Sequence, residues 1–210
     1  MRYHTVIWDF NGTIADDVAL GIRCVNHMLQ RRGLPILADT AAYRRVFCFP
    51  VREYYRKIGF DFARESYEIL AAEWVNLYIA GEPTLRLNPG FIEANDALHR
   101  AGIRQIILSS SENTMLQRQL KILGITDRLD AVYGMDNFYA GGKIEMARRC
   151  LGDNAGGSIV IGDTTHDADT ARAIGADCIL YTGGHGEKEA LAACGFPLAD
   201  NLADIPSMLG

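Results

Sequence analysis

The chain has 210 residues, of which 49% are hydrophobic and 22% are charged, and its formal net charge is −5. The length suits one domain, or one domain with a smaller insertion, and the composition is typical of a globular protein with a core of normal size. The negative charge argues against a general nucleic-acid or anionic-membrane surface, and no apolar run approaches the roughly 18 residues of a membrane span.

A short apolar strand over residues 3–9 is the first predicted element, and it ends in Asp9. The next part of the chain predicts only helices, because apolar residues recur three and four positions apart and no convincing strand pattern occurs from residue 15 to residue 80. These helices are expected over residues 15–30, 38–47, 51–58 and 63–80. Residues 81–83, Gly-Glu-Pro, are typical of a hinge.

After Pro89, strands and helices alternate. Strands are expected over residues 104–109, 129–133, 158–163 and 178–181, and helices over residues 91–101, 113–123, 142–151, 165–174 and 187–194. This alternation predicts an α/β fold with a doubly wound parallel, Rossmann-like sheet. The all-helical block is then an insertion after the first strand. We expect a core of residues 1–14 and 84–210, with a helical cap domain of residues 15–83 over the strand ends that bind ligands in open α/β sheets.

Reactive groups cluster at the predicted strand ends. Asp9 and Asp163 each end a strand, Ser109 ends another, and Lys143 and Asp167 open helices. In a parallel sheet these ends converge on one edge. The three carboxylates form an oxygen-rich site that suits Mg²⁺, which binds one or two carboxylates and bridges to a phosphate. With Lys143 and Ser109 as partners of phosphoryl oxygens and Asp9 as a carboxylate nucleophile, the set suits phosphoryl transfer through an aspartyl-phosphate.

Each of these residues also has a structural alternative. Asp9 and Ser109 are placed to cap the turn or helix that follows them. Lys143 is also consistent with a solvated helix residue, and Asp167 with a charge that stabilises a helix N-terminus. His166, next to Asp167, is interpreted as a bystander or a local hydrogen-bonding residue rather than as a catalyst.

Four segments of the chain resemble the four motifs of the haloacid dehalogenase superfamily. They are D-x-x-G-T-x-x-D at residues 9–16, Ser109 at the end of its strand, the downstream Lys143, and G-D-T-x-x-D at residues 162–167. The resemblance covers the whole chain, and the helical block resembles the cap that this superfamily inserts after the first motif. The run ARAIGADCILYTGGH at residues 171–185 resembles the phosphoglycolate-phosphatase-like branch.

This resemblance implies a metal site. Asp9 is similar to the nucleophile, which is also a magnesium ligand, and the backbone carbonyl of Asn11 corresponds to a second ligand. Asp163 corresponds to the second magnesium carboxylate, and Asp167 to the acid that supports it. The implied cofactor is Mg²⁺.

The resemblance also implies a catalytic and a phosphate-binding set. Ser109 is similar to the phosphate-binding hydroxyl and Lys143 to the charge-balancing lysine, and both act with Asp9 and Asn11 in catalysis. The implied activity is that of a Mg²⁺-dependent phosphatase-type hydrolase acting on a small phosphorylated metabolite, with no nucleic-acid or membrane partner. The substrate-binding residues are Thr13, Ser109, Ser110 and Lys143.

Asn11 departs from the pattern of phosphatases in this superfamily, which typically have an acid–base Asp there. An amide exchanges no proton at neutral pH, and losing such a group costs about 10²–10⁴ in rate. One hypothesis is a leaving group that needs no proton, such as that of an acyl phosphate, and another is proton transfer by Asp16, Asp17 or His27. The protein is alternatively a catalytically weak or inactive phosphometabolite-binding or regulatory protein. Deamidation at Asn11-Gly12 would give a fraction of molecules an acid.

The predicted cap gives few signs of its substrate. Lys57 is its one lysine and the one candidate for a Schiff base in phosphonate cleavage, although a solvated helix end is the plainer interpretation. Three arginines are candidate anion contacts, with surface positions as the alternative: Arg44, Arg45 and Arg52. Three aromatic side chains are interpreted mainly as core, with a place in the substrate pocket as the alternative: Tyr54, Tyr55 and Trp74.

The five cysteines are scattered, odd in number and without a C-x-x-C pair. They predict a reduced, intracellular protein with buried thiols rather than a disulfide framework. Since the N-terminus enters a strand almost at once, we expect no signal peptide and a cytoplasmic location. The sequence predicts no oligomeric state.

Overall fold

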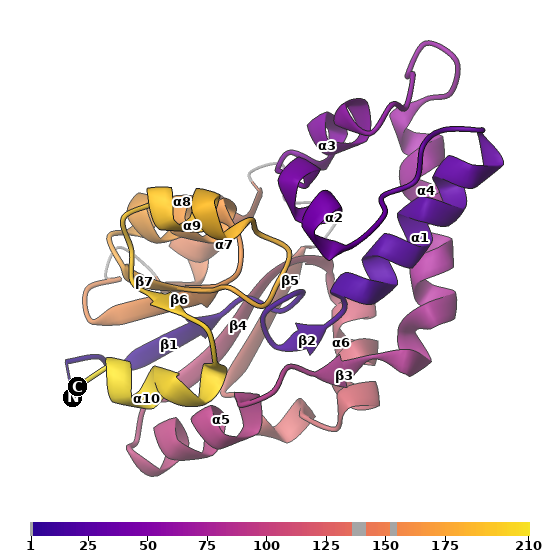
Figure 1. The fold of residues 1–210 in the computed structure, drawn as a ribbon. Helices are drawn as coiled ribbons and strands as arrows, with labels where there is room; N and C mark the ends of the chain where they lie inside the picture. The colour runs from indigo at the N-terminus through magenta and orange to yellow at the C-terminus, as the bar shows by residue number, and fades with distance from the viewer. Residues whose placement is uncertain (1, 136–141, 152–154) are drawn as a thin grey trace.

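A six-stranded parallel sheet is the centre of the computed structural model, which describes residues 2–135, 142–151 and 155–210 (Figure 1). The strand order is β5-β4-β1-β6-β7-β8, so the first strand lies inside the sheet. This order confirms the predicted doubly wound parallel sheet. The strands are β1 Thr5–Trp8, β4 Arg104–Glu112, β5 Ala131–Met135, β6 Ser158–Gly162, β7 Asp177–Tyr181 and β8 Leu198–Ala199.

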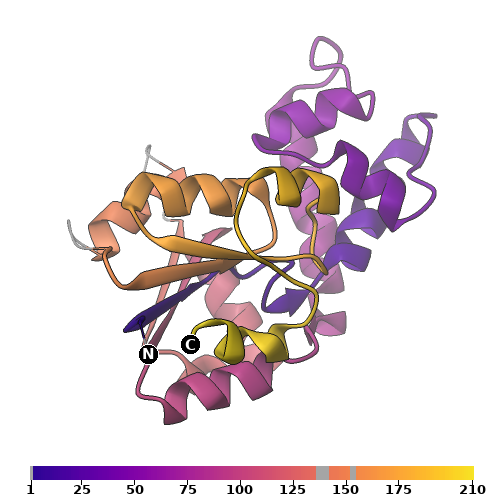
Figure 2. The same ribbon diagram turned by 60° about the vertical axis from the view of Figure 1, so that its left-hand side comes forward.

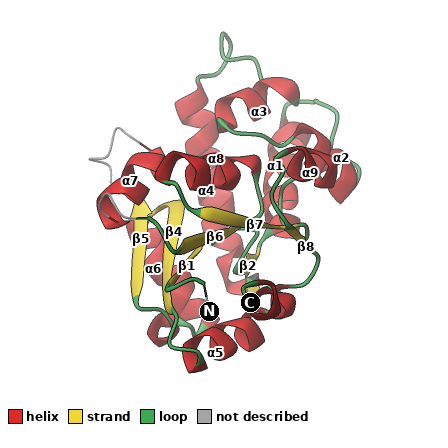
Figure 3. Ribbon diagram, turned by 90° about the vertical axis from the view of Figure 1, so that its left-hand side faces the viewer, coloured by secondary structure: helices red, strands yellow, loops and turns green. Residues whose placement is uncertain are grey.

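Helices cover both faces of the sheet, as Figure 3 shows. The strands are buried on both sides, and their side chains alternate between the two layers. In β1, Val6 and Trp8 join the hydrophobic cluster under α5, α6 and α10, whereas Ile7 joins the cluster under α7, α8 and α9. These helices are α5 Phe91–Arg100, α6 Asn113–Leu123, α7 Gly142–Leu151, α8 Thr165–Ile174, α9 Lys188–Ala193 and α10 Ile205–Met208.

The chain forms a separate group of helices between β1 and β4, which Figure 2 shows beside the sheet and its covering layers. Their apolar side chains build a hydrophobic cluster of their own, with Val25, Leu29 and Leu70 fully buried in it. A side-chain cap helps to start one of them, because Asp39 accepts a hydrogen bond from the N–H of Ala42. The helices are α1 Val18–Arg31, α2 Thr40–Val46, α3 Val51–Lys57 and α4 Tyr67–Gly81.

Two short strands were not expected, and one of them lies within residues 15–80, where no strand was predicted. β2 Ala15–Asp16 pairs antiparallel with β3 Arg86–Leu87 where the chain enters and leaves the helical block. A two-residue strand is too short to show an alternating pattern in the sequence. The residues predicted as a hinge lead into the short helix η1 Glu82–Thr84. The short helices η2 Thr126–Arg128 and η3 Leu202–Asp204, and also β8 and α10, were not expected.

The five cysteines are all free, and Cys24 and Cys178 are buried. This agrees with the prediction that the chain has no disulfide framework. No helix in the described ranges is long and apolar enough to cross a membrane.

Candidate active site

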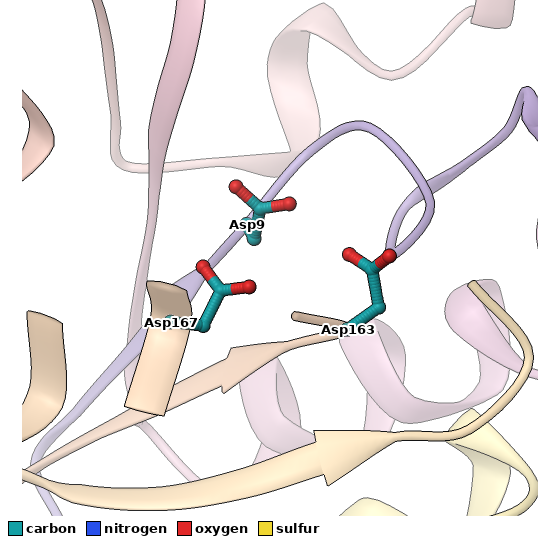
Figure 4. A group of neighbouring side chains, drawn as sticks. All are labelled: Asp9, Asp163 and Asp167. Atoms are coloured by element: carbon teal, nitrogen blue, oxygen red, sulfur yellow. The ribbon is translucent and has the colours of Figure 1, made fainter. Parts of the chain in front are cut away.

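Three carboxylates meet at the ends of the neighbouring strands β1 and β6. Asp9 directly follows β1, Asp163 directly follows β6, and Asp167 lies in the first turn of α8. One oxygen of each lies within 4.8 Å of the others, and Figure 4 shows the three side chains gathered at these strand ends. The chain builds outward from β1 to β5 and then returns to β6, so the cluster occupies the switch point where open α/β sheets bind ligands.

A buried lysine bridges two of these carboxylates. Lys143, on α7 and 3% exposed, donates from Nζ to Asp9 and, at 2.5 Å, to Oδ1 of Asp167. Burial opposes a charge on this amine, but the two carboxylates outweigh burial and raise the pKa of Lys143. The side chain is therefore an ammonium group at neutral pH, and the predicted contact with Asp9 is present.

The cluster holds more negative than positive charge. Three carboxylates face the ammonium of Lys143, and burial raises the pKa of Asp9 and of Asp163, the latter to about 6. For Asp167 burial acts in the same direction, but Lys143 outweighs it and lowers the pKa. Raised carboxyl pKa values mark anions that their surroundings stabilise incompletely, and a divalent cation supplies the missing positive charge. Since Mg²⁺ binds carboxylate oxygens, the donor set fits this ion.

Asp163 is held by hydrogen bonds at both of its oxygens. Oγ1 of Thr13 donates to Oδ1 at 2.8 Å, and the backbone N–H of His185 donates to Oδ2 at 2.6 Å. Thr13, predicted to bind substrate, is fully buried and does not line the cavity described below, so its side chain positions Asp163 instead. The backbone also approaches closely, because a Cβ atom at Gly12 would lie 2.3 Å from Oδ2 of Asp163.

Gly12→Ala is expected to destabilise the protein much more than Gly102→Ala. Both glycines have a positive φ, +77° and +73°, where an alanine costs about 1–2 kcal/mol. At Gly102 the added methyl group meets no atom within 4 Å, whereas at Gly12 it overlaps Asp163 and the ring of His185, which adds about 1–3 kcal/mol. Urea unfolding measures the difference, and equal losses would contradict the close packing of this turn around Asp163.

The amide of Asn11 is fixed by three partners. Its Nδ2 donates to Oδ2 of Asp17 at 2.9 Å and to the hydroxyl of Tyr78 at 3.0 Å, and its Oδ1 accepts from the hydroxyl of Ser111 at 2.6 Å. Asp17 and Tyr78 belong to the helical block and Ser111 to β4, so Asn11 joins the block to the sheet. The N–H of Gly12, the nucleophile in deamidation of Asn11, is occupied by a 2.7 Å hydrogen bond to Asp17.

Asp17 also pairs with a buried histidine. Nε2 of His185 lies 3.0 Å from Oδ1 of Asp17, and Nδ1 lies 2.7 Å from the hydroxyl of Tyr43 on α2. Burial opposes a charged imidazole, but Asp17 outweighs burial and raises the pKa of His185 to about 9. Burial alone would raise the pKa of Asp17, but His185 and the other hydrogen-bond donors lower it. The pair therefore carries both charges at neutral pH.

Of the three residues expected to replace the missing acid, only Asp17 reaches Asn11. Asp16 and His27 are exposed and do not line the cavity described below. Asp16 lies on the exposed side of β2, whereas Asp17 is the buried residue that precedes α1.

Sequence reasoning missed His185, Tyr43, Tyr78 and Ser111. His185 follows the end of β7 by four residues, so the strand-end argument used for Asp9 would also have found it. No sequence pattern marks the two tyrosines, because they reach the site only through the packing of the helical block against the sheet.

Tyr43→Phe is expected to cost about 1–3 kcal/mol of stability, because it leaves a buried nitrogen of His185 without its partner. Tyr54→Phe is the matched control. Tyr54 is also 3% exposed, but its hydroxyl has no hydrogen-bond partner among the described residues, so its removal should cost less than about 0.5 kcal/mol. Chemical denaturation of both variants measures the two losses. Equal losses would contradict the contribution of the Tyr43–His185 hydrogen bond.

A cavity of about 530 Å³ extends from the carboxylates to the helical block. Aromatic side chains of the block form one wall, and three of them are Tyr54, Tyr55 and Trp74, which belong to the hydrophobic cluster of the block as predicted and also line the cavity. Apolar cavities of this size with a few polar groups at one end are typical ligand sites. The predicted site residues on its opposite wall are Asp9, Asn11, Ser109, Ser110, Lys143 and Asp167.

A family model described as haloacid dehalogenase-like hydrolase matches residues 6–181. The chain belongs to this family. It is 30% identical over 195 residues to the phosphoglycolate phosphatase of Agrobacterium fabrum. The aligned region covers 85% of this chain and 80% of that protein. It is also 23% identical over 207 residues to the tyrosine-protein kinase PtkA of Mycobacterium tuberculosis, covering 97% of this chain and 70% of PtkA.

The structure of a haloacid dehalogenase-like hydrolase family protein from Streptococcus pneumoniae has the same fold. The TM-score is 0.85 at 20% identity, and the match covers 100% of this chain and 99% of that chain. The family membership inferred from the four motifs is thus confirmed.

The end of β4 brings three serines, Ser109, Ser110 and Ser111, to the cavity of this haloacid dehalogenase-like hydrolase. Ser109 is 1% exposed, and its Oγ accepts the N–H of Ser111 at 3.1 Å. This contact leaves the hydroxyl proton of Ser109 for a second partner. Ser110 is exposed, and both Ser109 and Ser110 line the cavity.

The basic residues singled out in the helical block of this hydrolase do not line the cavity. Arg44 donates to two backbone carbonyls of the loop after β7, at 2.7 and 2.6 Å. The guanidinium of Arg52 lies over two aromatic rings, 5.1 and 5.6 Å from their centroids. Arg45 and Lys57 are exposed. Arg44 and Arg52 therefore contribute to packing in this structure rather than to an anion site.

Proposed function

We propose that this chain is a Mg²⁺-dependent phosphatase-type hydrolase that acts on a small phosphorylated compound through an aspartyl-phosphate. The observation that carries the proposal is the contact of Lys143 with both Asp9 and Asp167, beside Asp163, at one end of a cavity. The hydrolase family and the 30% identity to a phosphatase support the reaction class. Phosphoryl transfer needs mainly positioning and charge neutralisation, which this arrangement supplies.

Asp9 is the proposed nucleophile. One of its oxygens accepts from Lys143, so the ammonium orients the carboxylate and the second oxygen attacks phosphorus. As this bond forms, the bond from phosphorus to the ester oxygen breaks, and the ester oxygen leaves with the electron pair. Water then hydrolyses the aspartyl-phosphate, which releases phosphate and restores Asp9. Ser109 and Ser110 donate hydrogen bonds to the phosphoryl oxygens.

The residues proposed to hold Mg²⁺ are Asp9, Asp163 and, through its backbone carbonyl, Asn11. When bound, the ion neutralises charge on the phosphoryl oxygens. Asp167 has a supporting part, because Oδ1 accepts from Lys143 and Oδ2 accepts from the N–H and the hydroxyl of Thr164 at 3.0 and 2.7 Å. Its role in the metal site is then to hold Lys143 in place.

The helical block is proposed to act as a cap domain of residues 15–83 on a core of residues 1–14 and 84–210. Its separate hydrophobic cluster supports this division, as does its connection to the core through the short strands β2 and β3. Closure of such a cap over a bound phosphate ester excludes water from the reaction. The hydrogen bonds from Asn11 to Asp17 and Tyr78 stabilise the closed arrangement.

A catalytically weak or inactive phosphometabolite-binding protein is the second candidate function. Asn11 favours it, because an amide provides neither a general acid for the leaving oxygen nor a general base for water. The two candidates differ in turnover, since a binding protein retains affinity for a phosphorylated ligand without releasing phosphate.

Phosphate release from sugar phosphates, phosphoglycolate, nucleotides, acyl phosphates and aryl phosphates tests the proposal. With Mg²⁺ we expect turnover of at least one compound, a loss of about 10²-fold or more in EDTA, and recovery when Mg²⁺ is returned. Binding without turnover in Mg²⁺ would favour the second candidate. Turnover that persists undiminished in EDTA would overturn the metal dependence.

A further inference from the structure

The wall of the cavity contributed by the helical block is aromatic. Val75 and Ile79 of α4 also line this wall, and they are 37% and 38% exposed, so an occupant would cover apolar surface that now faces solvent. Aromatic side chains make favourable edge-to-face and offset contacts with a further ring. Eight rings of the block line the cavity: Tyr43, Phe47, Phe49, Tyr54, Tyr55, Tyr67, Trp74 and Tyr78.

Among the described residues, each cation that lines the cavity already has an acidic partner, including His185, which pairs with Asp17. Residues 15–83, all of which the structure describes, contribute no lysine or arginine to the lining. On the opposite wall, Arg118 forms two hydrogen bonds with Glu82, at 2.7 and 2.9 Å, and Lys143 already contacts two carboxylates. A carboxylate or a second phosphate on the substrate would therefore lose its hydration without gaining a partner.

Sugar hydroxyls would find few partners either. The hydroxyl of Tyr78 donates to Asp17, and both oxygens of Glu112 accept backbone N–H groups at the start of α6. His166 lines the cavity with its ring stacked on Phe49 at 4.9 Å. The lining thus favours an apolar group over a polyhydroxylated one.

The amide at Asn11 favours the same kind of compound. Asn11 donates no proton suited to general acid catalysis, so the reaction depends on how well the leaving oxygen carries negative charge. A phenol ionises with a pKa of about 10, far below the pKa of an aliphatic alcohol, which resembles that of water. A phenolate therefore leaves without a proton far more readily than an alkoxide or a sugar oxygen.

We infer that the substrates are phosphate monoesters of aromatic alcohols, with the ring against the aromatic wall and the phosphorus beside Asp9. This inference rests on the proposed function and specifies its substrate class. The bond from phosphorus to the aryl oxygen breaks as the bond to Asp9 forms, and the aryl oxygen leaves with the electron pair and takes a proton from water. The cavity, at about 530 Å³, is within the range that holds aromatic ligands of drug size.

Phenyl phosphate and cyclohexyl phosphate form a matched pair of substrates, because they are similar in size and differ in aromaticity and in leaving-group acidity. We expect kcat/KM for phenyl phosphate to exceed the values for cyclohexyl phosphate, glucose 6-phosphate and phosphoglycolate by about 10²-fold or more. A preference for phosphoglycolate or the sugar phosphate would overturn the inference and leave the proposed function standing.

Binding tests the aromatic wall separately from leaving-group acidity. Phenylphosphonate, which has no ester bond to hydrolyse, is expected to bind about tenfold more tightly than phosphonoacetate in the presence of Mg²⁺. Of the two tryptophans, Trp74 lines the cavity and Trp8 is fully buried in the sheet. In the Trp8→Phe variant, quenching of the remaining tryptophan fluorescence therefore reports a ligand ring at Trp74.

Trp74→Leu tests the wall itself, and Phe62→Leu is its control, because Phe62 is an aromatic residue of the same block that does not line the cavity. We expect Trp74→Leu to weaken phenylphosphonate binding about tenfold and Phe62→Leu to leave it nearly unchanged. If wild-type protein prefers phenylphosphonate but hydrolyses no ester, the proposed function fails and the ligand class stands. Turnover without any preference for aromatic compounds would overturn the inference alone.

Discussion

Asp9→Asn is expected to lower phosphate release by about 10⁴-fold or more, because an amide oxygen is a poor nucleophile and forms no stable bond to phosphorus. Lys143 keeps its contact with Asp167 in this variant, so the site is expected to retain its shape and its affinity for a phosphorylated ligand. Rapid-quench and steady-state phosphate assays with Mg²⁺ measure the loss. Binding of phenylphosphonate shows that the variant still holds a ligand.

Asp16→Asn is the control for this experiment. The substitution removes the same charge from the same segment, but Asp16 is exposed and does not line the cavity. Its turnover should remain within about twofold of wild type, as for most surface substitutions. If Asp9→Asn kept more than a tenth of wild-type turnover, Asp9 would not be the nucleophile.

Asn11→Asp is expected to raise the turnover of alkyl phosphates by about 10²–10⁴-fold. The new carboxyl would lie beside Asp17, whose Oδ2 is now 2.9 Å from Nδ2 of Asn11. Two carboxyls at this distance do not both ionise, so the pair retains one proton and supplies a general acid. The gain should be smaller for phenyl phosphate, whose leaving oxygen needs no proton. Steady-state kinetics on phenyl and cyclohexyl phosphate measure both effects.

The same substitution is expected to cost about 1–3 kcal/mol of stability, because it removes the amide hydrogen that the hydroxyl of Tyr78 accepts. Thermal unfolding measures this cost. Asn76→Asp, at an exposed position on α4, controls for adding an acid to the helical block. Unchanged turnover of alkyl phosphates in Asn11→Asp would show that another group, Asp17 foremost, already transfers the proton.

Elements whose formation depends on residues close together in the chain were predictable from the sequence. The apolar run Val-Ile-Trp predicted β1, and the predicted ends of α6 and α8 were correct, each followed by a glycine, Gly124 or Gly175, in the left-handed conformation. The strands β2 and β3 were not predictable in this way, because they pair Ala15 with Leu87 across the whole helical block. Pairing between distant segments leaves no local period in so short a strand.

The acidic cluster was predictable for a topological reason. Parallel strands end on one edge of the sheet, so Asp9 and Asp163 were expected to meet although 154 residues separate them, and they do. Lys143 was singled out at the start of a helix and by the family resemblance, and its contact with Asp9 is present. Thr13 was expected to face the substrate, but a residue's position in a motif does not determine which hydrogen bond its side chain forms.

The sequence by itself determined the parallel sheet, the helical block after its first strand and the cluster of carboxylates, because local periodicity and strand ends specify all three. Only the tertiary structure decided what surrounds Asn11 and what lines the cavity. Tyr78 and Trp74 lie on α4 and line the cavity. The position of α4 relative to the sheet cannot be inferred from the local periodicity of the sequence. The packing of the helical block against the sheet also turns Arg44 onto backbone carbonyls, which leaves the wall of the cavity aromatic rather than cationic.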